Sequence, residues 1–190
     1  MSAVPALEPA PFSLTVNVRK LSKKGEHHTF EANEVQRAEI AARYDLVSIE
    51  SFVATAHAVP WRKGGVQVEG NITVKFTQPC AITAEPMDQT LEEPFNATFV
   101  PEGSKLAKPR VNGEGEIIVD AEGDDPPELF SGDTLELADI WLEFFALGID
   151  PFAAIEGAQL PSEVVPNPEA DEEEAAENSP FAALAALKKH

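Results

Sequence analysis

Residues 47–76 read VSIESFVATAHAVPWRKGGVQVEGNITVKF, and this stretch decides the fold. Two arms alternate between apolar and polar residues, which is typical of strands that bury one face. One face of the first arm holds Val47, Ile49, Ser51, Val53, Thr55, His57, Val59 and Trp61. The second arm carries Val66, Val68, Ile72, Val74 and Phe76. The Gly64-Gly65 pair between them supplies the backbone freedom of a tight turn, so the sequence predicts an antiparallel hairpin.

Shorter stretches with the same alternation lie on both sides of the hairpin. Residues 12–18 alternate strictly, and residues 27–31, 94–100 and 116–120 are short candidates for further strands. The stretch 122–128 contains two consecutive prolines, which supply no amide donors, and is therefore expected to be irregular. The strands together predict a mostly antiparallel sheet or a partly open barrel.

Two helices are predicted beside the sheet. Asn33 and Gln36 have the spacing of a capping box, and small apolar residues follow on one helical face up to about Tyr44. The second helix is predicted over 135–147, with Asp133 as its cap and Gly148 at its end. Its apolar face predicts that it seals the sheet, and it comprises Leu137, Ile140, Trp141, Phe144, Phe145 and Leu147. The alternative is an exposed face that binds a protein.

These elements predict an α+β domain with two packed helices and a disordered acidic C-terminal tail. Residues 1–11 contain three prolines and are expected to be flexible, and 12–160 are expected to form one domain. Residues 161–178 are rich in Pro, Glu and Ala without apolar periodicity, which predicts a disordered acidic linker. Residues 179–190 are then predicted to form a short helical motif.

The terminal motif begins with a Ser cap followed by proline and carries two lysines in its last turn. It is too short to be a stable helix alone. It either docks back on the domain or is a tethered recognition segment for a partner. The candidate partner-binding residues are Pro180, Phe181, Leu184 and Leu187.

The net charge of −19 is concentrated in one part of the chain. Residues 1–70 carry eight cationic and eight acidic residues, whereas 111–190 carry two and twenty, a net charge of −18. Such a region repels phosphates and attracts cationic partners. The alternative is that the acidic residues serve solubility.

Contact with nucleic acid therefore has to come from the balanced N-terminal half. Two small groups of cations lie there, and they are ordinary loop charges unless the fold brings them together. The candidate RNA-binding residues are Arg19, Lys20, Lys23, Lys24, Arg62 and Lys63.

The sequence contains no recognisable catalytic or metal-binding pattern, so no enzyme and no cofactor is expected. The single cysteine, Cys80, cannot form an internal disulfide and is expected to be buried, and His57 stands alone in an apolar strand, as core histidines do. No signal sequence or membrane span is visible, which predicts a cytoplasmic protein that does not contact membranes. The alternative is a metal-dependent RNA-processing enzyme that uses Asp120, Asp124 and Asp125.

Several segments, in order, resemble the YceD-like family of large ribosomal RNA subunit accumulation proteins. They are the strand 66–74 leading into Cys80-Ala-Ile-Thr83, the acidic helix that ends in Asp150-Pro151, and the terminal Pro180-Phe-Ala-Ala-Leu184. The resemblance spans about residues 12–189. Many members carry Cys-x-x-Cys where this chain has Thr83, so a metal or redox role for that spot does not carry over.

The resemblance implies a bacterial cytoplasmic factor for the accumulation of 23S rRNA of the large ribosomal subunit. It carries over no catalytic residues. The implied partners are rRNA, a basic ribosomal protein of the large subunit, or both, in ribosome biogenesis. A chaperone for one ribosomal protein that does not contact RNA is the other binding function.

Overall fold

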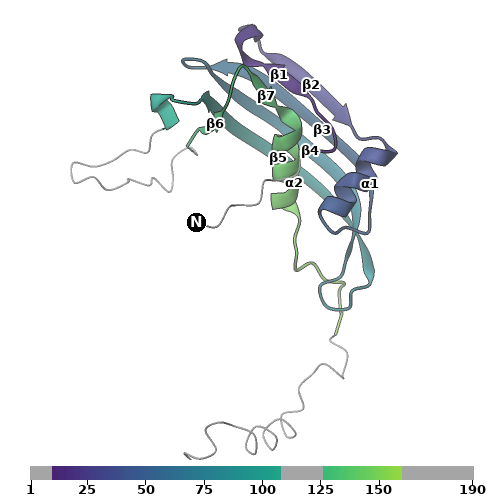
Figure 1. Ribbon diagram of the computed structural model, residues 1–190. Helices are drawn as coiled ribbons and strands as arrows, with labels where there is room; N and C mark the ends of the chain where they lie inside the picture. Colours follow the sequence, from purple (N-terminus) through teal and green to yellow (C-terminus); the bar gives the residue numbers. More distant parts are fainter. Residues whose placement is uncertain (1–9, 108–125, 160–190) are drawn as a thin grey trace, which may run out of the picture. The chain divides into compact units, whose positions relative to one another are not determined.

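A five-stranded sheet in the order β2-β3-β4-β5-β6 forms the body of the protein (Figure 1). The computed structural model describes residues 10–107 and 126–159. All neighbouring strands are antiparallel except β5 and β6, which are parallel, and the sheet does not close into a barrel. The strands are β2 (Glu26–Glu31), β3 (Ser48–Trp61), β4 (Gly65–Pro79), β5 (Pro86–Pro101) and β6 (Glu128–Phe130).

The predicted hairpin is confirmed, and β3 pairs with β4 from Ser48↔Thr77 to Trp61↔Gly65. On the predicted apolar face of β3 only Ile49 is buried in the core, because the register shifts between Ile49 and Ser51. Beyond this irregularity the even-numbered residues point inward. The core residues contributed by β3 are therefore Ile49, Phe52, Ala54, Ala56 and Ala58. On β4 the predicted residues Val66, Val68, Ile72, Val74 and Phe76 are all buried.

Strand β5 begins eight residues earlier than the predicted 94–100. Charged residues and two prolines make its first half look like a loop, but the long neighbour β4 pairs with it from Val66↔Phe99 to Pro79↔Pro86. Because β6 pairs with β5 only at Phe99, Val100 and Pro101, the rest of β5 is an edge strand among the described residues. Proline is compatible with an edge strand, which accounts for Pro94.

Helix α1 (Glu34–Arg43) has the predicted capping box. The Asn33 side chain accepts a hydrogen bond from the Gln36 amide at 3.0 Å, and the Gln36 side chain accepts one from the Asn33 amide at 2.9 Å. These two bonds satisfy amide donors that the first turn of the helix leaves free.

Helix α2 (Leu137–Gly148) begins later than predicted, and its cap is Glu136 instead of Asp133. The residues before it are extended, because β7 (Thr134–Glu136) pairs with β1 (Thr15–Asn17) in a separate two-stranded sheet. Asp133 instead forms an ion pair with Arg19, which belongs to the short 3-10 helix η1 (Val18–Lys20).

Helix α2 covers the inner face of the sheet, as predicted (Figure 1). Trp141 and Phe145 are fully buried, and the Phe145 ring meets Phe52 and Phe76 edge to face at 5.5 and 5.7 Å. Leu147 was expected on this apolar face, but it is 74% exposed. The far side of the sheet carries no helix of the described residues.

The chain divides into two compact units, of which the first contains the sheet and both helices (Met1–Pro79 and Pro86–Pro151). In the second unit, the turn Cys80–Glu85 is bonded to the segment after Pro151, because the Ala81 amide donates to Ala153 O at 2.9 Å. No helix of the described residues is long and apolar enough to cross a bilayer. The predicted strand 116–120, the linker 161–178 and the motif 179–190 lie outside the described residues.

Candidate nucleic-acid interface

Three connections of the chain meet at one end of the five-stranded sheet, which is here called the basic end. It consists of the loop 19–25 before β2, the turn 62–64 between β3 and β4, and residues 102–107 after β5. The antiparallel register places the start of β2 beside the end of β3, and the start of β4 beside the end of β5. The cations in these connections are Arg19, Lys20, Lys23, Lys24, Arg62, Lys63 and Lys105.

The loop before β2 is held closely against β3. Gly25 has a φ of +76°, and a Cβ there would lie 2.5 Å from Ala58 O, so the position requires glycine. The Lys24 carbonyl lies 3.2 Å from His57 Nε2, within hydrogen-bonding distance. The tight loop therefore presents Lys23 and Lys24 at the end of β3.

The turn between β3 and β4 presents the next two cations. Arg62 lies over the Trp61 ring, with its Cζ 4.5 Å from the ring centroid. A Cβ at Gly64 would lie 3.8 Å from Pro101 Cγ, which brings this turn beside the end of β5.

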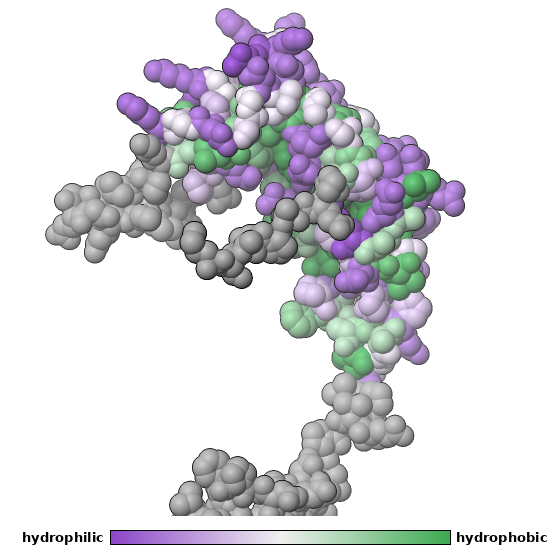
Figure 2. Space-filling model, viewed as in Figure 1, coloured by the Kyte–Doolittle hydropathy of each residue, from purple (hydrophilic) through white to green (hydrophobic). Residues whose placement is uncertain are grey.

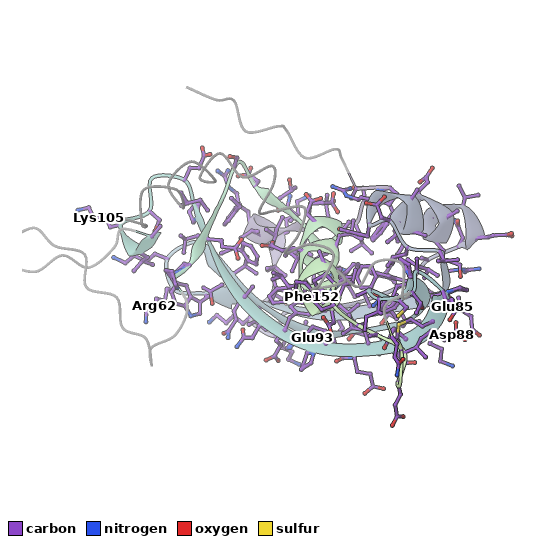
Figure 3. All side chains as sticks on the ribbon, turned by 90° about the horizontal axis from the view of Figure 1, so that it is seen from below. Arg62, Glu85, Asp88, Glu93, Lys105 and Phe152 are labelled. Carbon is purple, nitrogen blue, oxygen red and sulfur yellow. The ribbon has the colours of Figure 1, made fainter. Side chains whose placement is uncertain are left out.

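Lys105 was not among the candidate residues, and the structure adds it to the basic end. It lies on the short 3-10 helix η2 (Lys105–Ala107), and the Ser104 amide before it donates to Pro101 O. In Figure 3, Arg62 and Lys105 are at one end of the curved sheet and Asp88 is at the other. Sequence could have indicated Lys105 only through the positive charge of its loop, because its position at the same end as the other turns depends on strand order.

The structure thus brings the two sequence groups of cations to the same end of the sheet. Figure 2 shows hydrophilic side chains projecting there, at the upper end in this view. Arg19 is partly engaged, because its Nε lies 2.7 Å from Asp133 Oδ1 although its side chain is 78% exposed. The other cations have no ion pair among the described residues.

Acidic side chains also lie near one another at α2 and at the strands before it. Partial burial raises the pKa of Glu128, and the nearby charge of Glu143 raises it further. Burial likewise raises the pKa of Asp139, with a contribution from Glu136. Carboxylates therefore lie close to one another beside α2, whereas the basic end holds seven cations and also Glu102.

The prediction that His57 is a core histidine is wrong. It lies on the outer face of the sheet, where its ring stacks on that of His27 with centroids 3.9 Å apart and planes within 6°. The shift at Ile49 is the reason, since it turns the odd-numbered residues of β3 outward. His28 points to the other face, opposite Ala56, as the alternation predicts.

Cys80 is buried, as predicted, with 3% of its surface exposed. Hydrogen bonds from the Thr83 side chain and from backbone amides, including that of Ile155, lower the pKa of its thiol to about 7. Thr83 therefore acts as a hydrogen-bond donor to the thiolate. Among the described residues no group of three His, Cys, Asp or Glu side chains is placed to hold a metal ion.

Two sets of predicted residues are not described by the structure. One is the candidate partner-binding set, Pro180, Phe181, Leu184 and Leu187. The other is the carboxylate set of the enzyme alternative, Asp120, Asp124 and Asp125.

The candidate site therefore lies at the basic end of an open sheet in an α+β domain. The sequence profile of the family described as "Large ribosomal RNA subunit accumulation protein YceD" matches residues 68–188. The chain therefore belongs to the YceD family, and membership implies a part in the accumulation of large-subunit ribosomal RNA. No curated protein and no solved structure was found to match the chain.

Proposed function

We propose that this protein is a non-enzymatic binding factor that supports the accumulation of 23S rRNA during ribosome biogenesis in the cytoplasm. It acts by contacting the RNA through its basic end. The observation that supports this is the meeting of cations from three separate connections at one end of the sheet. Cations that converge in this way neutralise neighbouring phosphates, whereas scattered loop charges do not.

A basic ribosomal protein of the large subunit is the second partner in the proposal. Residues 111–190 carry a net charge of −18, which increases the rate of encounter with a cationic protein. The apolar residues of the segment 179–190 then provide an anchor for that protein.

A salt series tests the RNA contact with the full-length protein and a labelled fragment of large-subunit rRNA in filter binding. We expect the logarithm of the association constant to fall linearly with the logarithm of salt concentration, by about 0.7 per phosphate contacted on a single strand. Replacing Lys20, Lys23, Lys24 and Lys63 by Gln should flatten this slope. The control is Lys75→Gln, which removes an exposed cation in the middle of β4. Equal slopes for the two variants would contradict the proposal.

Removal of residues 179–190 tests the protein partner. We expect fewer ribosomal proteins to co-purify with the truncated protein, while its unfolding midpoint in urea stays the same. Unchanged co-purification would contradict the anchoring role. Incubation of the pure protein with rRNA and Mg²⁺ is the control for the enzyme alternative, and we expect the RNA to remain intact.

A further inference from the structure

We propose that the outer face of the sheet at the basic end binds unpaired RNA bases by stacking, on the Trp61–Arg62 pair and on the His27–His57 pair. This inference rests on the proposed function, and it names the form of RNA that the basic end takes. Two flat side-chain stacks lie on this face, and cations lie beside both.

The first stack is formed by Trp61 and Arg62. The guanidinium lies over the indole at 4.5 Å, which fixes the plane of an otherwise flexible side chain. On the strand beside it, a Cβ at Gly65 would come within 3.1 Å of Trp61 Cε3, so glycine leaves room for the indole. Arg62 itself is exposed, and nucleobases stack on guanidinium planes as they do on aromatic rings.

The backbone of Arg62 is an independent reason to assign it a function. Its φ is +43°, in the left-handed region that residues with a Cβ rarely adopt. Glycine or asparagine would fit this turn position better than arginine. Strained backbone of this kind is concentrated at functional sites. There a residue is retained because its side chain is needed, although another residue would suit the backbone conformation better.

The second stack is formed by His27 and His57. The His57 ring is held from both sides, with Nδ1 at 3.4 Å from Glu69 Oε1 and Nε2 at 3.2 Å from Lys24 O. His27 lies parallel to it and is exposed. A fixed ring with an exposed parallel partner offers a flat surface on which a base can stack.

The two stacks are in line along one strand. His57 and Trp61 are four residues apart on β3, so they share the outer face at a separation of about 13 Å. Lys24 lies beside the His27–His57 stack through its carbonyl contact with His57, and Lys63 follows Arg62 directly. Flat groups for bases with cations for phosphates are the combination that binds single strands.

This arrangement favours a single strand over a duplex. In an A-form duplex the base faces are covered by neighbouring bases, so only phosphates and 2′-hydroxyls are available to the cations. A single strand offers its base faces to the stacks in addition to its phosphates.

The test uses the full-length protein with two fluorescent probes, a single-stranded oligouridylate and an RNA duplex of the same length. Arg62→Lys keeps the charge and removes the planar group, so we expect about tenfold weaker binding of the single strand, within the range for loss of one base stack. The dependence on salt should stay the same, because the number of cations is unchanged. His27→Ala should weaken the same probe, again without changing the salt slope.

Arg43→Lys on α1 is the matched control and should bind both probes as the unchanged protein does. If Arg62→Lys and His27→Ala bind the single strand as tightly as the unchanged protein, the stacking inference is wrong while the RNA contact stands. Preference of the unchanged protein for the duplex would also overturn it. If the unchanged protein binds neither probe nor the rRNA fragment, and only a ribosomal protein, then the RNA contact itself is wrong.

Discussion

The turns before and after β4 each contain one strained residue, but they differ in the contacts that compensate for the strain. The turn before β4 holds Arg62 at a φ of +43°, and the turn after it holds Ala84 at +59°. The turn after β4 closes on itself, because the Ala84 amide donates to Cys80 O at 2.9 Å and the Cys80 amide donates to Glu85 O at 2.8 Å. Within the turn before β4 the Gly64 amide donates to Arg62 O at 3.2 Å, and the strand pair Trp61↔Gly65 closes the turn.

The difference shows how each turn compensates for its strain. A left-handed residue with a Cβ costs roughly 1–2 kcal/mol. The hydrogen bonds of the Cys80–Glu85 turn offset that cost within the turn. At Arg62 the contact with Trp61 offsets only part of it, since an exposed cation–π pair contributes about 0.5–1 kcal/mol. The part of the conformational cost that this contact does not offset agrees with a role of the Arg62 side chain in binding and not in folding.

The largest expected effect is on the free energy of unfolding. It separates the cost of a steric clash from the cost of an unfavourable φ at the two glycines between β3 and β4. In Gly65→Ala the new Cβ would lie 2.8 Å from Phe99 O and 2.9 Å from Trp61 O, and neither backbone atom can move freely. We expect a loss of about 2–3 kcal/mol in the free energy of unfolding, measured in urea. Gly64→Ala is the control, because its Cβ meets nothing closer than 3.8 Å and only its φ of +77° is unfavourable. The steric account fails if Gly64→Ala proves the more harmful of the two.

An effect of intermediate size tests how the hydrogen bonds in the turn after β4 lower the pKa of Cys80. The Thr83 side chain is the main cause of the lowered pKa of Cys80, which is about 7. The thiolate is the reactive form, so the rate of alkylation should rise through pH 7 in the unchanged protein. In Thr83→Val the midpoint should move up towards the ordinary thiol pKa, because the anion loses a donor.

Thr77→Val serves as the control for this measurement. The Thr77 hydroxyl donates to Asp88 Oδ1 at 2.8 Å, and Thr77 is not among the groups that lower the pKa of Cys80, so the midpoint should stay in place. An equal shift in both variants would mean that Thr83 has no specific effect on Cys80.

The architecture was predictable where the pattern was local. The hairpin followed from alternation and the paired glycines, and the first helix followed from Asn33 and Gln36. The burial of Trp141 and Phe145 followed from helical spacing. In each case neighbours in sequence determine the structure, so the sequence contains the required information.

The rest depended on partners distant in sequence. Nothing near Asp133 reveals that β1 pairs with β7 and displaces the cap to Glu136. A one-residue shift at Ile49 turned His57 outward, and alternation alone does not locate such shifts. Each cation of the basic end can be read from the sequence, but only the strand order places the loop before β2 near the turn at Arg62.

The smallest expected effect compares the two strained residues directly. Arg62→Gly and Ala84→Gly each relieve a left-handed conformation, so each should raise the free energy of unfolding by about 0.5–1 kcal/mol. The urea midpoint measures this gain for Arg62→Gly, and hydrogen exchange of the Ile155 amide measures it locally for Ala84→Gly. Only Arg62→Gly should weaken binding of the single-stranded probe. A more stable protein that binds RNA less well would show that this turn retains arginine for binding, whereas unchanged binding would leave its strain without a function.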